Sequence, residues 1–137
     1  MTGELPVELF TDGASRGNPG QAAIGAWARR GDEILFEISR AIGKKTNNEA
    51  EYLALLAGLE RLLARGATDA PVRVYMDSQL IVRQLSGQYK VKSAGLRPLW
   101  EKARALVAEF PDIVVEHVPR AQNQRADALA NQALDQL

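Results

Sequence analysis

The spacing of apolar residues between positions 52 and 63 constrains the fold of this chain more than any other feature of its sequence. The apolar side chains recur after three or four positions, which places them on one side of an α-helix. They belong to Tyr52, Leu55, Leu56, Leu59, Leu62 and Leu63. Gly66 follows them and is a typical residue for ending a helix. The segment therefore predicts a helix with one apolar side.

Three strand-like segments come before this helix, over Val7–Thr11, Ala22–Arg30 and Glu33–Ile42. Asp12-Gly13 is a turn signal after the first segment, and residues 12–20 are so rich in Gly, Asn and Pro that we expect a loop there. Gly31-Asp32 joins the other two segments. Three successive strands with short connections predict an antiparallel meander.

The rest of the chain alternates between strands and helices. We expect strands over Val72–Met76 and Ile113–Val118, and helices over Ser78–Leu85, Arg97–Phe110 and Asn123–Leu134. This order predicts an α/β fold: a five-stranded mixed sheet, with a three-strand antiparallel meander plus two parallel strands, flanked by helices on both faces. A chain of 137 residues without a repeat or linker is expected to form a single domain over residues 1–137.

Composition excludes several kinds of functional site. The chain has no cysteine, which rules out disulfides and thiolate metal ligands. Its single histidine, His117, lies in a strand pattern and is expected to be structural. The sequence contains neither a Ser/His/Asp or Cys/His nucleophile system nor a P-loop. The 17 basic and 17 acidic residues cancel, so a nucleic acid would have to be held by local basic groups.

Residues 1–6 lack the positive run and apolar stretch of a signal peptide, and no apolar run is long enough to span a bilayer. We expect a cytoplasmic protein with no membrane partner, and a monomer as the simplest assembly.

Four acidic residues could form a site, although each also has an ordinary structural interpretation. Asp12 before Gly13 is a turn former. Asp77 could cap the helix that follows it, and Asp127 lies early in the last helix, where the helix dipole favours an acid. The dipole also favours Glu51 in the first turns of the leucine-rich helix.

The capping pattern of that helix distinguishes two glutamates. Thr46 and Glu49 match a capping box, which gives Glu49 a structural role. Glu51 lies about 200° further around the helix, so it is free to face a site.

The functional interpretation of the four acids depends on their expected positions relative to one another. Asp12 and Asp77 follow strands that are expected to be parallel neighbours, and ligand sites gather at the carboxyl ends of such strands. Glu51 and Asp127 could face the same edge from the starts of their helices. Carboxylates gathered in this way need cations, and oxygen-only ligands suit Mg²⁺, with Mn²⁺ as the alternative. Two such ions would suit in-line attack on a phosphodiester.

At this point the residues resemble the motifs of the ribonuclease H type 1 family. The four matching segments occur in order over nearly the whole chain; they are Phe10–Ser15 with Gly17–Gly20, Thr46–Glu51, Asp77–Gln79, and Asn123–Ala130. The resemblance implies Mg²⁺-dependent hydrolysis of the RNA strand of an RNA/DNA hybrid by an endonuclease, with 5′-phosphate and 3′-hydroxyl ends. It implies that Asp12 bridges two ions, that Asp127 completes the site of the water-activating ion, and that Glu51 and Asp77 hold the second.

The same resemblance implies a set of substrate-binding residues for the minor groove and a phosphate, namely Asn18, Thr46, Asn47, Asn48 and Gln79. The shallow minor groove of an A-like duplex exposes 2′-hydroxyls and base edges to such side chains. Each residue also has a bland interpretation. Asn18 could form a turn, Thr46, Asn47 or Asn48 could cap the helix, and Gln79 could be a solvated first-turn residue.

Two departures from the family pattern point to a compact subgroup. The segment Pro119–Gln122 replaces a longer histidine-containing loop, so Arg120, Gln122 or Arg125 would have to substitute for that histidine. The basic protrusion that grips DNA in some relatives is reduced to residues 88–96, where Lys90 and Lys92 either contact the DNA backbone or solvate a loop. Weaker and more salt-sensitive binding is therefore expected.

Three hypotheses follow: an active hybrid-specific nuclease, a binding module that has lost its chemistry, and another metal-dependent nuclease on the same fold. All four acids are present, which favours an active enzyme. Double-stranded RNA has a similar minor groove, so activity on it stays open.

Overall fold

The structure is a computed structural model that describes residues 5–137. Its five strands form one sheet in the order β3-β2-β1-β4-β5. The strands are β1 (Val7–Gly17), β2 (Gly20–Arg30), β3 (Glu33–Lys45), β4 (Val72–Met76) and β5 (Ile113–His117). β1 to β3 are antiparallel, while β4 pairs in parallel with β1 and with β5. The predicted α/β fold with a mixed five-stranded sheet is confirmed.

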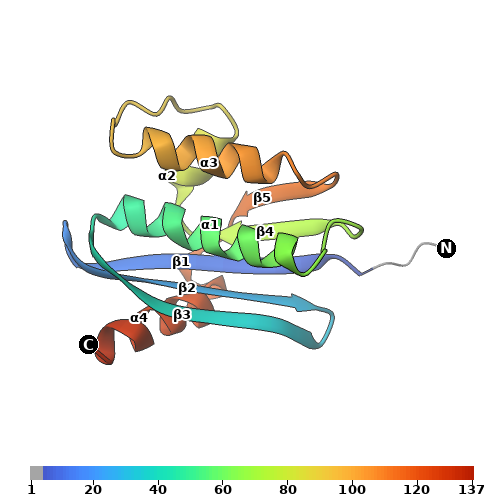
Figure 1. The fold of residues 1–137 in the computed structure, drawn as a ribbon, viewed down its shortest axis with the longest axis horizontal. Helices are drawn as coiled ribbons and strands as arrows, with labels where there is room; N and C mark the ends of the chain where they lie inside the picture. Colours follow the sequence, from blue (N-terminus) through green and yellow to red (C-terminus); the bar gives the residue numbers. More distant parts are fainter. Residues whose placement is uncertain (1–4) are drawn as a thin grey trace.

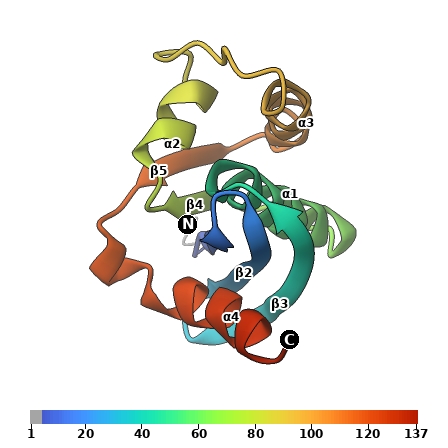
Figure 2. The same ribbon diagram turned by 90° about the vertical axis from the view of Figure 1, so that its left-hand side faces the viewer.

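Four α-helices cover the two faces of this sheet. They are α1 (Asn47–Ala64), α2 (Gln79–Leu85), α3 (Arg97–Val107) and α4 (Gln124–Asp135), and a short 3₁₀ helix, η1 (Arg120–Gln122), precedes α4. Figures 1 and 2 show α1 and α3 on one side of the sheet and α4 on the other. Helices on both faces of the sheet can therefore contribute residues to one site.

The main core lies between α1 and the sheet, as the apolar spacing predicts. Tyr52, Leu55 and Leu59 on α1 are fully buried against strand residues such as Leu9 and Val74. The helix ends where expected, because Gly66 takes the left-handed conformation (φ 73°) and donates its N–H to the Leu63 carbonyl. The buried side chains hold α1 against the sheet, and Gly66 ends the helix.

The first strand is longer than predicted, and the expected loop over residues 12–20 is wrong. β1 continues to Gly17 and pairs with β2 along its whole length, from Val7↔Arg30 to Gly17↔Gly20. Asn18-Pro19 alone forms the tip of the hairpin. The small residues of β2 opposite the glycine-rich segment allow this pairing, so tertiary contacts override the local turn preference.

Other boundaries move by a few residues. β3 runs to Lys45 instead of Ile42, and α3 ends at Val107 instead of Phe110. The last helix spans Gln124–Asp135 instead of Asn123–Leu134, and β5 ends at His117. The ends of elements are set by pairing and packing that a local pattern does not record.

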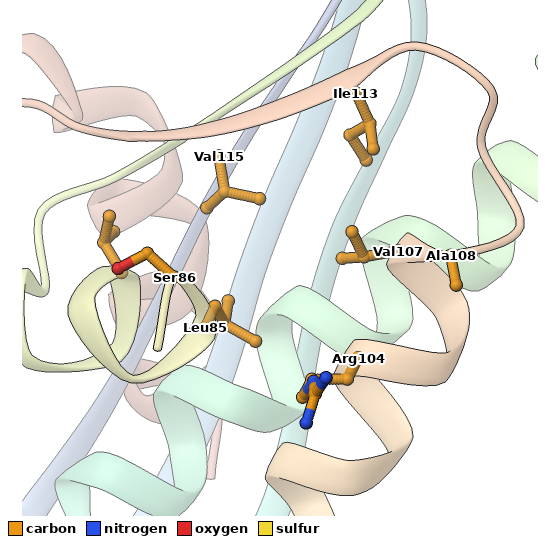
Figure 3. Close-up of a pocket in the computed structure, with 8 residues that line it drawn as sticks. Leu85, Ser86, Arg104, Val107, Ala108, Ile113 and Val115 are labelled. Carbon is orange, nitrogen blue, oxygen red and sulfur yellow. The ribbon is translucent and has the colours of Figure 1, made fainter. Parts of the chain in front are cut away.

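An apolar cavity of about 350 Å³ lies between α2, α3 and the edge strand β5. Figure 3 shows Leu85, Val107, Ile113 and Val115 facing one another across it, with Arg104 at one side. Its lining contains none of the predicted site residues.

The helices of residues 5–137 are all too short or too polar to cross a membrane. The expectation about a signal peptide concerns residues 1–6, of which 1–4 lie outside the described residues.

Candidate active site

Asp12 lies inside β1, not in a turn after it. It is paired with Gly25 of β2 and is only 5% exposed. The turn-former interpretation of Asp12 is therefore wrong. A carboxylate buried within a sheet needs either a proton or a nearby cation, because burial disfavours its charged form.

Glu51 reaches the same place from the start of α1. Its Oε1 accepts a hydrogen bond from the Gly13 N–H at 3.1 Å. Glycine is required at position 13, since a Cβ there would lie 2.2 Å from the Ala50 carbonyl carbon. The predicted capping box is confirmed: Glu49 N donates to Thr46 Oγ1 at 3.1 Å, and Thr46 N donates to Glu49 Oε1 at 2.9 Å. Glu51 is thus left free of the cap, as expected.

Asp77 follows the last residue of β4 and does not cap the next helix. Ser78 is the cap of α2, and its Oγ accepts from the Ile81 N–H at 3.4 Å. The interpretation of Asp77 as a helix cap is therefore wrong, and its carboxylate is available to the site.

Asp127 comes from the opposite layer, in the first turn of α4. This helix packs very closely on β2, where a Cβ on Gly25 would lie 2.1 Å from the Ala126 carbonyl oxygen. The buried Asn123, which is 1% exposed, also donates its amide to the Thr11 carbonyl oxygen of β1 at 2.9 Å. Two contacts therefore seat Asp127 beside the strand that carries Asp12.

The structure brings three of the four predicted acids into one group. One carboxylate oxygen from each of Asp12, Glu51 and Asp77 lies within 4.8 Å of the others. Asp127 stands outside this group, but its charge and a shared hydrogen bond act on Asp12. The predicted convergence thus holds for three acids, with the fourth at its margin.

The electrostatics of the group reflect this crowding. Burial, followed by the charges of Glu51 and Asp77, raises the pKa of Asp12 to about 9. Burial, followed by the charge of Asp77, raises the pKa of Glu51 to about 8, although the Gly13 N–H, Asp12 and Arg120 act in the opposite direction. The raised pKa values show that the crowded negative charges of this group disfavour full ionisation.

The donor set fits a hard divalent cation. All the ligand atoms of the group are carboxylate oxygens, which Mg²⁺ and Mn²⁺ prefer. A bound cation would replace the protons that the raised pKa values of Asp12 and Glu51 imply. Asp12, Glu51 and Asp77 could therefore hold a metal ion that acts on a phosphodiester.

Four of the five predicted substrate-binding residues lie near the start of α1. Asn18, Thr46 and Asn48 line one cavity of about 330 Å³ together with Glu49, Ser93, Gly95 and Leu96. Asn18 Oδ1 accepts from the Asn47 N–H, and Asn47 Oδ1 accepts from the Ser15 N–H, both at 3.0 Å. These bonds tie the hairpin tip to α1.

The alternative helix-cap interpretation of Asn47 and Asn48 is wrong, because Thr46 is the cap. Asn47 and Gln79 are exposed, and Gln79 begins α2 two residues after Asp77. Asn18, Thr46, Asn47 and Asn48 therefore form one polar band at the start of α1, and Gln79 lies separately at the start of α2.

Sequence reasoning missed some residues near the site. Ser93 and Gly95 line the cavity from the segment before α3, and nothing in their local sequence marks them. The amides of Asn123 and Asn131 contact Thr11 and Asp127 respectively. For Asn131, its position four residues after Asp127 on the helix was the available signal.

The candidate substitutes for the missing histidine differ in their surroundings. Arg125 forms an ion pair with Glu37 and stacks over the Trp27 ring at 4.3 Å. Arg120, in η1, acts electrostatically on Glu51. His117 is exposed in β5. Arg120 is therefore the better placed of the two arginines.

Comparison with known proteins gives the chain its family. Residues 10–133 match the reverse transcriptase-like family. The chain is 48% identical to ribonuclease HI of Halobacterium salinarum over 130 residues, which cover 94% of this chain and 64% of that protein. It is also 48% identical to a bifunctional protein of Mycobacterium tuberculosis over 133 residues, which cover 96% of this chain and 36% of that protein. The chain thus spans less than two thirds of the length of these relatives.

Solved structures agree with this relationship. The crystal structure of ribonuclease H1 from Halobacterium salinarum superimposes with a TM-score of 0.91 and 46% identity, and the match covers 96% of this chain and 99% of that one. A second ribonuclease H1, called LC11, was crystallised in complex with an RNA/DNA hybrid; it gives a TM-score of 0.89 and 44% identity over 95% of this chain and 97% of that one. This chain belongs to the ribonuclease H family of hydrolases.

Proposed function

We propose that this chain is an endonuclease that hydrolyses the RNA strand of RNA/DNA hybrids by a two-metal-ion mechanism, with 5′-phosphate and 3′-hydroxyl products. The observation that carries the proposal is the group formed by Asp12, Glu51 and Asp77, whose oxygens lie within 4.8 Å of one another. The LC11 relative crystallised with such a hybrid supports the choice of substrate.

Each carboxylate has a proposed role at two divalent cations. Asp12 would contribute to both ions, Asp127 would complete the site of one, and Glu51 and Asp77 would hold the other. When bound, such a pair activates a water molecule and stabilises the departing oxygen. The Gly13 N–H orients Glu51 through its 3.1 Å hydrogen bond, and the seat of α4 on β2 keeps Asp127 beside Asp12.

Recognition of the hybrid is assigned to the polar band and to Gln79. Asn18, Asn47, Asn48 and Gln79 offer short amides to the 2′-hydroxyls and base edges of a shallow minor groove. Thr46 lines the same 330 Å³ cavity as Asn18 and Asn48, and this cavity would take a backbone phosphate. Double-stranded RNA presents a similar groove, so slower cleavage of it is part of the proposal.

The test compares four substrates at equal concentration, with and without Mg²⁺: an RNA/DNA hybrid, double-stranded RNA, double-stranded DNA and single-stranded RNA. We expect cleavage of the hybrid that depends on Mg²⁺, with Mn²⁺ as a substitute, and 5′-phosphate ends on the products. Equal cleavage of all four substrates, or cleavage without a divalent ion, would contradict the proposal.

Assembly and location stay predictions. A monomer is the proposed active form, because the three gathered carboxylates and Asp127 all come from one chain. A size measurement in solution, alone and with the hybrid, tests this. The cytoplasm is the proposed location and can be checked by cell fractionation.

A further inference from the structure

Asp127, the acid that stands outside the carboxylate group, is held by an amide of its own helix. Nδ2 of Asn131, one turn further along α4, donates to Asp127 Oδ1 at 3.2 Å and to the Asp127 backbone oxygen at 3.0 Å. Both residues are partly buried. Because one amide group contacts both oxygens, it fixes the side chain of Asp127 relative to its own backbone.

The helix that carries these two residues is itself fixed to the sheet. Asn123 donates its amide to the Thr11 carbonyl oxygen at 2.9 Å, directly before Asp12 in β1. Asn123 also accepts the Asp127 N–H with its backbone oxygen at 3.1 Å. Asn123 thus sets where α4 lies on β1, and Asn131 sets the direction of the Asp127 carboxylate.

We propose that Asn131 is a positioning residue of the metal site: its amide holds the Asp127 carboxylate so that Asp12 and Asp127 bind one divalent cation together. The inference rests on the proposed function. Carboxylate oxygens of Asp12, Glu51 and Asp77 lie within 4.8 Å of one another, and Asp127 interacts with Asp12 without belonging to this group. Because Asp127 comes from α4, its approach to Asp12 depends on how Asn131 holds its carboxylate.

A role for Asn131 in positioning Asp127 and a role in stabilising α4 can be distinguished by experiment. Asparagine is a poor residue for the interior of a helix and alanine is the best one. The metal-free Asn131→Ala variant should therefore be about as stable as the wild type, or more stable. If Asn131 positions Asp127, the same variant should bind cations more weakly, since loss of a hydrogen bond to a metal ligand commonly costs about 10–100-fold in affinity or activity.

The experiment titrates Mg²⁺ without nucleic acid and follows the rise in Tm of the wild type and four variants. Asn131→Ala removes the amide, Asn131→Leu keeps a similar size without a donor, and Asn131→Gln keeps an amide that can reach Asp127 from the next turn. Gln132→Ala changes the exposed neighbour on α4 and is the matched control. The Mg²⁺ dependence of hybrid cleavage is then measured for each protein.

We expect the half-saturating Mg²⁺ concentration to rise about tenfold or more in Asn131→Ala and Asn131→Leu. It should recover in part in Asn131→Gln and stay unchanged in Gln132→Ala. Excess Mg²⁺ should restore much of the cleavage rate with little change in KM for the hybrid. An unchanged half-saturating concentration in Asn131→Ala and Asn131→Leu overturns the inference.

The two proposals fail in different ways. A wild type that cleaves the hybrid and responds to Mg²⁺, beside Asn131 variants that respond equally, overturns only the role of Asn131. A wild type that neither responds to Mg²⁺ nor cleaves the hybrid overturns the proposed function and this inference with it.

Discussion

Asp12 is the residue in which the conflict between stability and chemistry is sharpest. It is 5% exposed, it lies within 4.8 Å of two other carboxylates, and its pKa is raised to about 9 by burial first and by these charges next. Functional sites commonly reduce stability in this way. The gathered charges are a disadvantage for the metal-free fold and become useful when a cation binds.

Asp12→Asn removes the proposed bridging ligand and keeps the size of the side chain. We expect Mg²⁺-dependent cleavage of the hybrid to fall by at least about a hundredfold, a loss typical of removing one preorganised electrostatic group. The circular dichroism spectrum should stay that of the wild type. Normal turnover by this variant would remove Asp12 from the mechanism.

The stability of the metal-free protein should fall as pH rises. The pKa values of Asp12 and Glu51 are raised from 3.8 and 4.5 to about 9 and about 8, so the folded state binds more protons than the unfolded state across this interval. Unfolding then releases protons, and the free energy of unfolding decreases with pH. Stability from these groups is complete below about pH 4 and is lost as pH passes their folded pKa values.

Melting temperatures measured in EDTA between about pH 5 and pH 9 check this dependence. Mg²⁺ should reverse the trend, because it binds the deprotonated carboxylates and its stabilising effect grows with pH. A metal-free Tm that stays level or rises over the interval would contradict the raised pKa values.

At the scale of elements, the sequence was sufficient to predict whether each segment forms a helix or a strand, but not the residues at which it begins and ends. Val72–Met76 matches β4, and the leucine spacing gives α1 with its cap at Thr46. The extension of β1 to Gly17 could not be predicted, because it depends on pairing with β2. A segment rich in Gly, Asn and Pro resembles a loop when it is considered without its partner strand.

The contact between α4 and β2 predicts the effect of filling Gly25. A Cβ there would lie 2.1 Å from the Ala126 carbonyl oxygen, so Gly25→Ala must displace the helix that carries Asp127. Overpacking of this kind costs about 1–3 kcal/mol, and each kcal/mol lowers Tm by roughly 2–4 °C in a chain near this size. Thermal unfolding measures the change.

Gly95→Ala is the matched control, because a Cβ at position 95 would meet its nearest neighbour at 3.7 Å, an ordinary contact. Its Tm should stay close to that of the wild type. Equal Tm values for the two variants would mean that α4 adjusts freely to the added methyl group.

Two substitutions at the start of α2 distinguish the effect of a negative charge from the effect of a helix cap. Asp77→Asn should raise the metal-free Tm, because the charge of Asp77 opposes ionisation of both Asp12 and Glu51. Ser78→Ala removes the observed cap and should cost about 1 kcal/mol. Thermal unfolding in EDTA measures both. A clear drop in Tm for Asp77→Asn would contradict the unfavourable charge interaction assigned to Asp77.

At the scale of the whole molecule, the acids of the site could be predicted from the sequence, but the contacts that hold them in place could not. The turn and cap interpretations of Asp12 and Asp77 failed because strand pairing and Ser78 fill those roles. The distance of Asp127 from the other acids depends on how closely α4 approaches β2, and no local pattern contains that information. Ser93 and Gly95 reach the cavity near Thr46 only through the path of the chain before α3.

The balanced net charge makes binding of the hybrid depend on a few local cations. The 17 basic and 17 acidic residues cancel, and the exposed Lys90 and Lys92 lie in the segment before α3. If Lys92 contacts a phosphate, Lys92→Gln should reduce the slope of log Kd against log salt by about one. Lys102→Gln, an exposed lysine on α3, is the control. Equal slopes for the wild type and Lys92→Gln would mean that Lys92 only solvates its loop.

The seat of α4 also determines which part of the molecule opens first. This helix meets the sheet largely through alanines, namely Ala126, Ala130 and Ala133, which bury little apolar area each. Local separation of α4 should therefore need less free energy than separation of the leucine-rich α1. Asp127 leaves the site whenever α4 does, so an ion shared by β1 and α4 would join the last helix to the first strand. The supply of divalent ions in the surrounding medium would then govern how readily a protease attacks the C-terminal helix.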